Sequence, residues 1–291
     1  MQDARNLAEM LSRADRLPTG DAAAVLKVAN LCAGREASAD AVAGSAGRDV
    51  RFSAELLRLA NSAFSAPREP IVSLPVAITR LGLSLVESLA RAFSASGLLR
   101  GCPDPELAQR IHQHSVRTGV MAYAFADGGL SRDEALAAGL LQNTGLYLFA
   151  FAAPTSLKRL TVADTTDRLF YELEYETFGT THAEAGAALA SKWGFPAPLV
   201  EVMAEHDLPI PSTRIGAVAR LADLVARQQG YGIEPPEEIH PGLAIKAQVT
   251  DAAGLLEVKL PTLAGTIDAL DRLVGISPVV SGANAPMSLV A

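Results

Sequence analysis

Hydrophobic side chains recur every three or four residues through most of this chain, which is the spacing of one face of an α-helix. Near the N-terminus Leu7, Met10, Leu11 and Ala14 carry the pattern and predict a helix over residues 2–16. In the first hundred residues no strand-like alternation interrupts this periodicity. Breaks at proline, glycine and polar residues divide that region into further predicted helices at about 21–31, 38–47, 52–64, 73–82 and 84–99.

Capping chemistry marks several of the expected helix starts. A serine or threonine followed three residues later by glutamate can form a capping box, as in the pairs Ser84 with Glu87, Ser131 with Glu134, and Thr181 with Glu184. Asp104 and Pro105 supply an N-cap and a first-position proline for a long helix to about residue 126. More helices are predicted at about 155–162, 166–177, 181–194, 196–206, 212–229 and 260–274. Residues 230–248 have a looser pattern, and the last dozen residues are expected to fray.

Two adjacent amides, Gln142 and Asn143, interrupt the otherwise apolar run over residues 135–153. A buried amide without partners costs on the order of 1–3 kcal/mol, so two neighbouring amides are expected to face a polar cleft or a hydrogen-bond network. We expect both on the helix that Ser131 opens, where adjacent side chains are close enough in direction to share one pocket. The pair therefore predicts a polar site, or the remains of one, inside the core.

Composition narrows the function classes. A hydrophobic content of 49% with 20% charged residues is typical of a globular protein, and an aromatic content of 5% favours helices over sheets. The net charge of −7 argues against nucleic acid as the main partner. No secretory signal and no uninterrupted apolar run of about 18 residues is visible, so no membrane partner is expected. Cys32 and Cys102 fit no metal spacing and indicate free thiols in a reducing cytoplasm.

Several motifs, taken together and in order, resemble the HDOD (HD-related output domain) family over roughly residues 17–212. The fragments that carry the resemblance are Leu56-Leu57-Arg58-Leu59-Ala60-Asn61-Ser62-Ala63-Phe64, Ile71, Ser73-Leu74, Ala77-Ile78, Leu81-Gly82, His114-Ser115, Ala138-Gly139-Leu140-Leu141, Gly145, Phe178-Gly179-Thr180-Thr181-His182-Ala183-Glu184-Ala185-Gly186-Ala187, Trp193-Gly194-Phe195-Pro196 and His206. Each fragment alone is weak, and the combination is specific. The resemblance implies an all-α fold in which an N-terminal helical lobe, residues 1–102, packs on an HD-like helical bundle, residues 103–230. Residues 231–291 would form a C-terminal extension with one helix and a frayed tail.

The resemblance reaches further, to HD-domain metal-dependent phosphohydrolases, whose helices present a His, a His-Asp pair, further His residues and a closing Asp. The positions of this chain that match that order are His114, the pair Gln142 and Asn143, His182, His206 and Asp223. In such a site a carboxylate and imidazoles hold a divalent ion that activates water. Asparagine lacks the negative charge of aspartate, and glutamine is a poor substitute for imidazole. The remaining residues are expected to bind at most one divalent metal weakly, and no cofactor is expected.

The histidines also have purely structural interpretations. His114, in the middle of an apolar helix, fits a hydrogen-bonded core histidine. His182, in a first helical turn, fits a polar helix start, where the helix dipole would disfavour the imidazolium form. His206 with Asp207 fits a surface pair at a helix end.

We therefore expect a bacterial-type signal-transduction module, a pseudoenzyme that acts through protein partners of a signalling pathway. Two alternatives stay open. One is a metal-dependent phosphohydrolase (phosphodiesterase) that uses the remaining His and Asp residues; stoichiometric metal with turnover abolished in His114→Ala would favour it. The other is a sensor whose cleft binds a nucleotide or another small anion without chemistry; a nucleotide that raises the melting temperature would favour that one.

Overall fold

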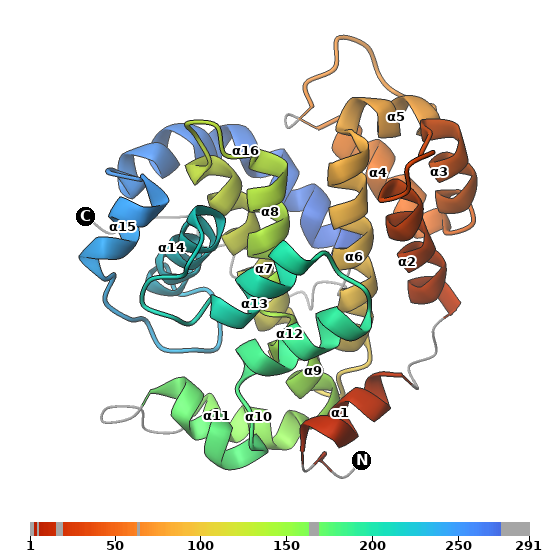
Figure 1. Ribbon diagram of the computed structural model, residues 1–291. Coiled ribbons are helices and arrows are strands. Elements are labelled where there is room, and N and C mark those ends of the chain that lie inside the picture. The colour runs from red at the N-terminus through yellow and green to blue at the C-terminus, as the bar shows by residue number, and fades with distance from the viewer. Residues whose placement is uncertain (1–2, 5, 16–19, 63–64, 163–168, 275–291) are drawn as a thin grey trace.

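The computed structural model describes residues 3–4, 6–15, 20–62, 65–162 and 169–274 (Figure 1). These residues form helices and no strand, which confirms the predicted all-α class. In chain order the helices are α1 (Leu7–Ala14), α2 (Gly20–Cys32), α3 (Ala39–Ala46), α4 (Val50–Ala60), α5 (Leu74–Leu81), α6 (Leu83–Arg100), α7 (Pro105–Phe125), α8 (Arg132–Leu141), α9 (Thr144–Ala152), α10 (Pro154–Leu160), α11 (Phe170–Phe178), α12 (His182–Lys192), α13 (Ala197–Glu205), α14 (Arg214–Gln228), α15 (Pro241–Ala247) and α16 (Ala252–Val274). The predicted frayed tail, and the predicted helix ends at residues 2, 16, 63–64 and 166–168, lie outside the described residues.

Helix α6 joins the N-terminal helices to the rest of the molecule (Figure 1). It contacts α2 and α4 of the N-terminal lobe as well as α8 and α9. Because it is covered by these helices, its buried positions lie all around its axis, as expected of a helix within a core. Phe93 of α6 packs against Phe52 of α4 with ring centroids 5.3 Å apart, which anchors the lobe.

Helix α7 lies at the centre of the second half, in contact with α8, α14 and α16. Its approach to α8 requires glycine, because a Cβ atom on Gly139 would lie 2.7 Å from the Cα atom of Gly119. The approach of α9 to α12 is closer still, since a Cβ atom on Gly145 would lie 1.8 Å from the carbonyl oxygen of His182. Helix α16 contacts α7 and also α4, so it connects the bundle to the N-terminal lobe.

The helix predicted to carry Gln142 and Asn143 is in fact interrupted there. Helix α8 ends at Leu141, the two amides form a turn, and α9 begins at Thr144. The Thr144 hydroxyl donates a hydrogen bond of 2.6 Å to the carbonyl oxygen of Leu141, so a side chain takes a carbonyl that a continuous helix would pair with a backbone N–H. The prediction was wrong because this local competition is invisible in the hydrophobic period.

Three other helix starts test the capping predictions. Half of the Ser131 and Glu134 box forms: the Ser131 hydroxyl accepts a hydrogen bond from the Glu134 N–H at 3.3 Å, and α8 has no return bond from the Glu134 side chain among the described residues. The Thr181 and Glu184 capping box forms as predicted. The Ser84 and Glu87 box does not form, because the N-cap of α6 is Gly82, two residues before Ser84, and Glu87 pairs with Arg91 instead at 2.8 Å. The region after residue 230 also holds two helices rather than one: α15 lies within the stretch predicted to be loose, and α16 begins at residue 252 rather than 260.

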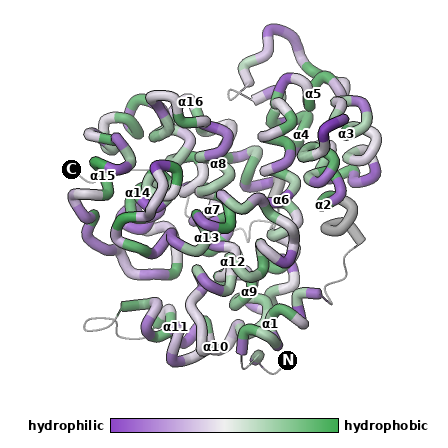
Figure 2. Tube along the Cα trace, viewed as in Figure 1, coloured by the Kyte–Doolittle hydropathy of each residue, from purple (hydrophilic) through white to green (hydrophobic). Residues whose placement is uncertain are grey.

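One stretch, Arg132–Ala152, passes a length and composition test for a membrane span, although no such stretch was expected. It comprises α8, the turn and α9, and 94% of its most apolar window is buried inside the protein. Figure 2 shows the hydrophobic colouring of these helices continuing into the helices packed around them. Packing in the core therefore accounts for the apolar character of the stretch.

Candidate functional site

Three of the predicted site residues meet in the interior, between α7, the turn after α8, and α14. His114 Nε2 lies 2.8 Å from Oδ1 of Asp223, and the Asn143 Nδ2 group donates to the same oxygen at 3.3 Å. The exposed fraction of each residue is 2% or less. The structure thus brings together His114, Asn143 and Asp223, which lie far apart in the sequence.

Gln142 is fully buried but does not join this group. Among the described residues, neither its amide oxygen nor its amide nitrogen has a hydrogen-bond partner. Gln142 is the first residue of the turn and its backbone keeps helical angles, whereas the Asn143 side chain reaches Asp223.

Two arginines hold the second oxygen of Asp223. Arg220 Nη1 lies 3.1 Å and Arg227 Nη2 lies 2.8 Å from Oδ2. The three residues are spaced by three and four positions along α14, so they share one face of that helix. Burial raises the pKa of Asp223, but the Arg227 and Arg220 guanidinium groups and His114 outweigh it and hold the pKa well below its usual range. Asp223 is therefore a buried carboxylate that is already neutralised.

An HD-type catalytic metal does not fit these residues. Position 143 offers an amide in place of a carboxylate, and the Asn143 amide nitrogen points at Asp223. Both oxygens of Asp223 are engaged, one by His114 and Asn143 and the other by two guanidinium groups. A cation placed between these groups would have to displace the arginines, whose fixed positive charges already do its electrostatic work.

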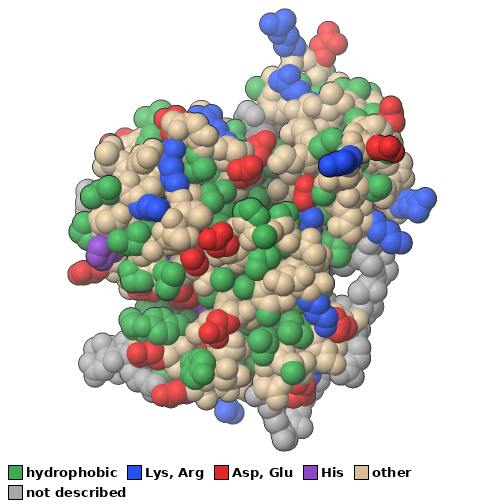
Figure 3. Space-filling view, in the orientation of Figure 1, with side chains coloured by type: hydrophobic (Ala, Val, Ile, Leu, Met, Phe, Trp, Pro, Cys, Tyr) green, Lys and Arg blue, Asp and Glu red, His purple; other side chains and the backbone are tan. Residues whose placement is uncertain are grey.

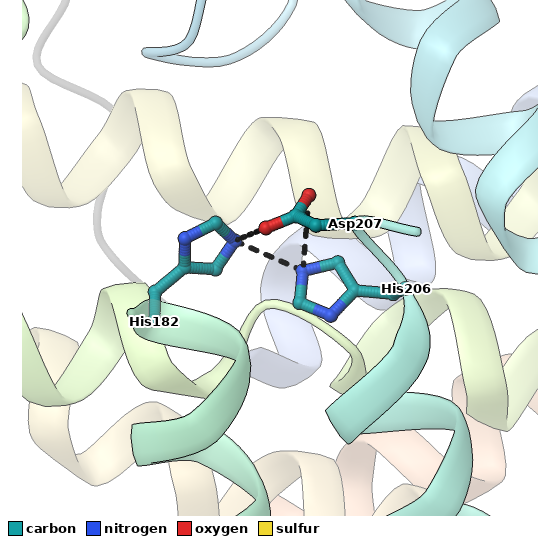
Figure 4. A group of neighbouring side chains, drawn as sticks. All are labelled: His182, His206 and Asp207. Carbon is teal, nitrogen blue, oxygen red and sulfur yellow. Dashed lines mark hydrogen bonds and ion pairs between the residues drawn. The ribbon is translucent and has the colours of Figure 1, made fainter. Parts of the chain in front are cut away.

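A second group of buried side chains lies where α12 begins and α13 ends (Figure 4). His182 and His206 approach one another through their Nε2 atoms at 2.9 Å, and Asp207 Oδ2 lies 3.3 Å from His182 Nε2. His206 Nδ1 lies 2.7 Å from the carbonyl oxygen of Met203 and so donates to it. The His206 Nε2 atom then carries a lone pair and accepts a hydrogen bond from His182.

His182 is held in place by a buried glutamate. Its Nδ1 atom lies 2.8 Å from Oε2 of Glu174, and its backbone N–H donates to the same oxygen at 2.9 Å. Burial alone would lower the pKa of His182, but the carboxylates of Glu174, Asp207 and Glu234 raise it to about 10. The imidazolium form is therefore favoured, and the prediction that the helix dipole would disfavour it was wrong, because these charges are nearer than the helix end.

His206 has the opposite environment. Burial lowers its pKa to about 4, against the opposing influence of Asp207. The residue is fully buried, so the interpretation of His206 and Asp207 as a surface pair was wrong. The two imidazoles thus differ in charge: His182 is a donor at both nitrogens, whereas His206 is neutral.

The two groups form one network, because the same arginines reach both. Asp207 Oδ1 lies 3.3 Å from Arg220 Nη1 and 3.5 Å from Arg227 Nη2. Arg227 Nη1 also contacts Glu234 Oε2 at 2.7 Å. Burial raises the pKa of Glu234 to about 8, although Arg227 and His182 oppose the shift.

Glu237 closes the network at the surface. Its carboxylate lies 2.8 Å from Arg220 and 3.0 Å from Arg227.

Sequence reasoning missed five residues of this network: Glu174, Arg220, Arg227, Glu234 and Glu237. One signal was present, since charged residues three and four positions from Asp223 interrupt an otherwise apolar helix. The glutamates gave no local signal, because their partners lie on other elements.

A cavity of about 380 Å³ opens onto this network between α11 and the segment before α15. Its polar lining consists of Asp207, Arg220, Glu234, Glu237, Glu238 and His240. Apolar side chains, among them Phe170, Tyr171 and Leu224, form the other walls. Figure 3 shows the hollow on the left of the molecule, with acidic side chains along its edge. The cavity therefore connects the buried charges to solvent through a mostly acidic opening.

Comparison with known proteins adds the family relationship. The model of the HDOD domain matches residues 17–209. An uncharacterized protein of Treponema pallidum is 30% identical over 169 residues, a match that covers 56% of this chain and about a third (32%) of that protein.

Solved structures share the fold. An HDOD domain protein of unknown function from Geobacter sulfurreducens superposes with a TM-score of 0.71 at 24% identity, covering 92% of this chain and 96% of that one. A candidate phosphohydrolase from Shewanella amazonensis gives 0.63 at 22% identity, covering 92% and 98%. A candidate signal transduction protein from Marinobacter aquaeolei gives 0.62 at 20% identity, covering 88% and 59%. At these identities the likeness concerns the fold.

Proposed function

Because the chain belongs to the HDOD domain family, we propose that it is a non-catalytic regulatory module of signal transduction that acts through contacts with protein partners. The observation that carries the proposal is the pairing of both Asp223 oxygens with His114, Asn143, Arg220 and Arg227. A hydrolytic relative would need that carboxylate for a metal ion. Here it serves to hold α7, α14 and the turn after α8 together.

The chemistry of the positions around Asp223 supports the same conclusion. Metal-assisted hydrolysis requires anionic and imidazole ligands that leave one position open for water. Gln142 and Asn143 supply amides, and Gln142 does not reach the cluster by any hydrogen bond in the described residues. The residues near Asp223 can therefore bind and orient one another, but they lack the groups that would hold a metal-bound water.

The charge of the cavity beside the network favours the regulatory module over a nucleotide sensor. Its lining carries the carboxylates of Asp207, Glu234, Glu237 and Glu238 against one guanidinium group, that of Arg220. A phosphate group would meet net repulsion there, because like charges at short range cost more than one arginine recovers.

The test is a paired assay on the untagged full chain. Cyclic dinucleotides and linear nucleotides are incubated with the protein in Mg²⁺, Mn²⁺ or Zn²⁺, and products are separated by chromatography. The proposal expects no product above the protein-free control and no shift of melting temperature with any nucleotide. Turnover that His114→Ala abolishes would establish the hydrolase instead, and a selective melting shift without turnover would establish the sensor.

A further inference from the structure

The second group of side chains, at His182 and His206, is built differently from the arginine-neutralised cluster. Its ring nitrogens converge: the two Nε2 atoms are 2.9 Å apart, and one ligand atom each from His182, His206 and Asp207 can be chosen so that all lie within 4.8 Å of one another. Glu234 Oε1 lies 3.8 Å from His182 Nε2 on the cavity side. Two imidazoles and the Asp207 carboxylate thus converge, and the Glu234 carboxylate lies beside them.

Each imidazole ring is held in its orientation by a contact at its Nδ1 atom. The Nδ1 atom of His182 contacts the Glu174 carboxylate, and that of His206 donates to the Met203 carbonyl. This is the arrangement found behind metal-ligating histidines, in which a carboxylate or carbonyl fixes the ring and leaves the other nitrogen to coordinate. The two Nε2 atoms share one proton in a hydrogen bond here, and a bound ion would take the place of that proton, which would leave to solvent. The Oδ2 atom of Asp207 also has no hydrogen-bond partner in the described residues, which leaves it available on the same side.

The balance of fixed charge points the same way. Five carboxylates take part in the network, those of Glu174, Asp207, Asp223, Glu234 and Glu237. Three positive groups offset them within it: the guanidinium groups of Arg220 and Arg227 and the imidazolium of His182. Uncompensated charge in a buried site is costly, so the network has room for further positive charge. Both oxygens of Asp223 are occupied, whereas Asp207 and Glu234 each contact an arginine through one oxygen and turn the other toward His182 Nε2.

A route for a cation is present. The cavity beside the network has Asp207 and Glu234 among its lining residues, with Glu237 and Glu238 nearer its rim. An opening lined by one sign of charge concentrates ions of the other sign.

From this geometry we propose that His182, His206, Asp207 and Glu234 form a binding site for one divalent transition-metal ion, of which Zn²⁺ is the best fit. Two nitrogen and two oxygen donors suit Zn²⁺, whereas Mg²⁺ and Ca²⁺ prefer oxygen donors alone. The two Nε2 atoms would move apart to roughly 3.3 Å, the separation expected of two nitrogens on a tetrahedral zinc. That shift is a few tenths of an ångström from the observed distance.

Such an ion would work as a conformational link. His182 starts α12, His206 and Asp207 follow α13, and Glu234 belongs to the segment between α14 and α15. Binding would tie that segment to the α12–α13 pair and cover part of the cavity. The module would then respond to metal by stabilising one arrangement of the surface around α11 and α15.

The experiment uses the untagged full chain, freed of metal with a chelator and dialysed. Zinc is titrated by calorimetry, bound metal is counted by mass spectrometry, and Co²⁺ is added in place of zinc to read coordination from its visible spectrum. We expect one zinc per chain, a higher melting temperature with zinc, and a four-coordinate cobalt spectrum. No retained zinc, or only an octahedral cobalt spectrum, would overturn the proposal.

Single substitutions test which residues bind the ion. His206→Gln and Glu234→Gln remove one donor each, and we expect zinc affinity to fall at least 10-fold in either. Glu174→Gln removes the group behind His182, and a loss of about 10- to 100-fold is expected. Folding of each variant is checked by circular dichroism; Glu234→Gln, at a loop position, keeps the test valid if His206→Gln does not fold.

The matched control is His112→Gln. His112 is a further buried histidine paired with a carboxylate, lying 3.3 Å from Asp271, and it takes no part in the network. We expect this variant to bind zinc like the unaltered chain. Equal zinc affinity in Glu234→Gln, Glu174→Gln and the control would refute the assignment. Zinc binding without hydrolysis would support the zinc site and agree with the proposed regulatory function. Hydrolysis of a phosphodiester at any metal concentration would refute the proposed regulatory function but not the zinc site.

Discussion

Replacing Gly145 with alanine tests how closely α9 and α12 must approach to hold His182 in place. The new Cβ atom would lie 1.8 Å from the His182 carbonyl oxygen, 2.6 Å from its carbonyl carbon and 2.9 Å from the backbone nitrogen of Gly186. All three contacts are backbone atoms, so no side chain can rotate away. The two helices must therefore separate by about 1 Å or more before the contact becomes tolerable.

That separation would break the hydrogen bonds of His182. Its contacts with Glu174 at 2.8 Å and with His206 at 2.9 Å cannot lengthen by that amount and remain hydrogen bonds. Overpacking costs about 1–3 kcal/mol, and a buried hydrogen bond to a charged group contributes about 1.5–3 kcal/mol. We expect Gly145→Ala to lower the free energy of unfolding by about 3–5 kcal/mol.

The assay is urea unfolding followed by circular dichroism, with two graded comparisons. Gly186→Ala should cost less, because its nearest contact is a single backbone atom, the nitrogen of Gly145 at 2.9 Å. Gly44→Ala is the control, since this exposed glycine within α3 has nothing within 4 Å of the added atom. Alanine there should be neutral or stabilise by up to about 1 kcal/mol. A Gly145→Ala variant within about 1 kcal/mol of the unaltered chain would refute the claim that this approach positions His182.

Three further predictions concern the buried charges and the thiols. Arg227→Met should lower the free energy of unfolding in urea by about 3–5 kcal/mol because it leaves buried carboxylates unpaired, while the exposed Arg48→Met should stay within about 0.5 kcal/mol; equal effects would contradict the pairing. The double variant Gln142→His with Asn143→Asp should gain no phosphodiesterase activity in Mn²⁺, because the arginines still hold the closing aspartate; metal-dependent turnover in this variant would show that the amides alone were limiting. Burial raises the pKa of the Cys32 thiol to about 11, so alkylation of the folded chain should stay slow up to about pH 10 and become fast in urea; rapid labelling of the folded chain at pH 8 would contradict this.

The periodicity of apolar residues was sufficient to predict the all-α class, because helix faces that bury against neighbours repeat in the sequence. The order of the motifs identified His114 and Asp223 as site residues. In the fold, His114 Nε2 lies 2.8 Å from Asp223 Oδ1. The turn after α8 escaped prediction, since a single hydroxyl, that of Thr144, competes for a helix carbonyl. Such a local bond does not alter the hydrophobic pattern.

The charge state of the site could not be read from the sequence. The imidazolium of His182 depends on Glu174, Asp207 and Glu234, which lie on other elements and meet it only in the folded chain. An argument from the helix end considers one element at a time. Here it predicted a lowered pKa for His182, whereas the pKa is raised. The place of Arg227 among buried carboxylates depends in the same way on tertiary contacts.

The most direct test of the central claim, that Asp223 is committed to arginines and not to a catalytic metal, is a rate measurement. The initial rate of bis(p-nitrophenyl) phosphate hydrolysis is measured against concentration of the untagged full chain in excess Mn²⁺, with His114→Ala alongside. The structure predicts a slope of zero for both proteins. A rate that rises in proportion to the unaltered chain and vanishes in His114→Ala would contradict it.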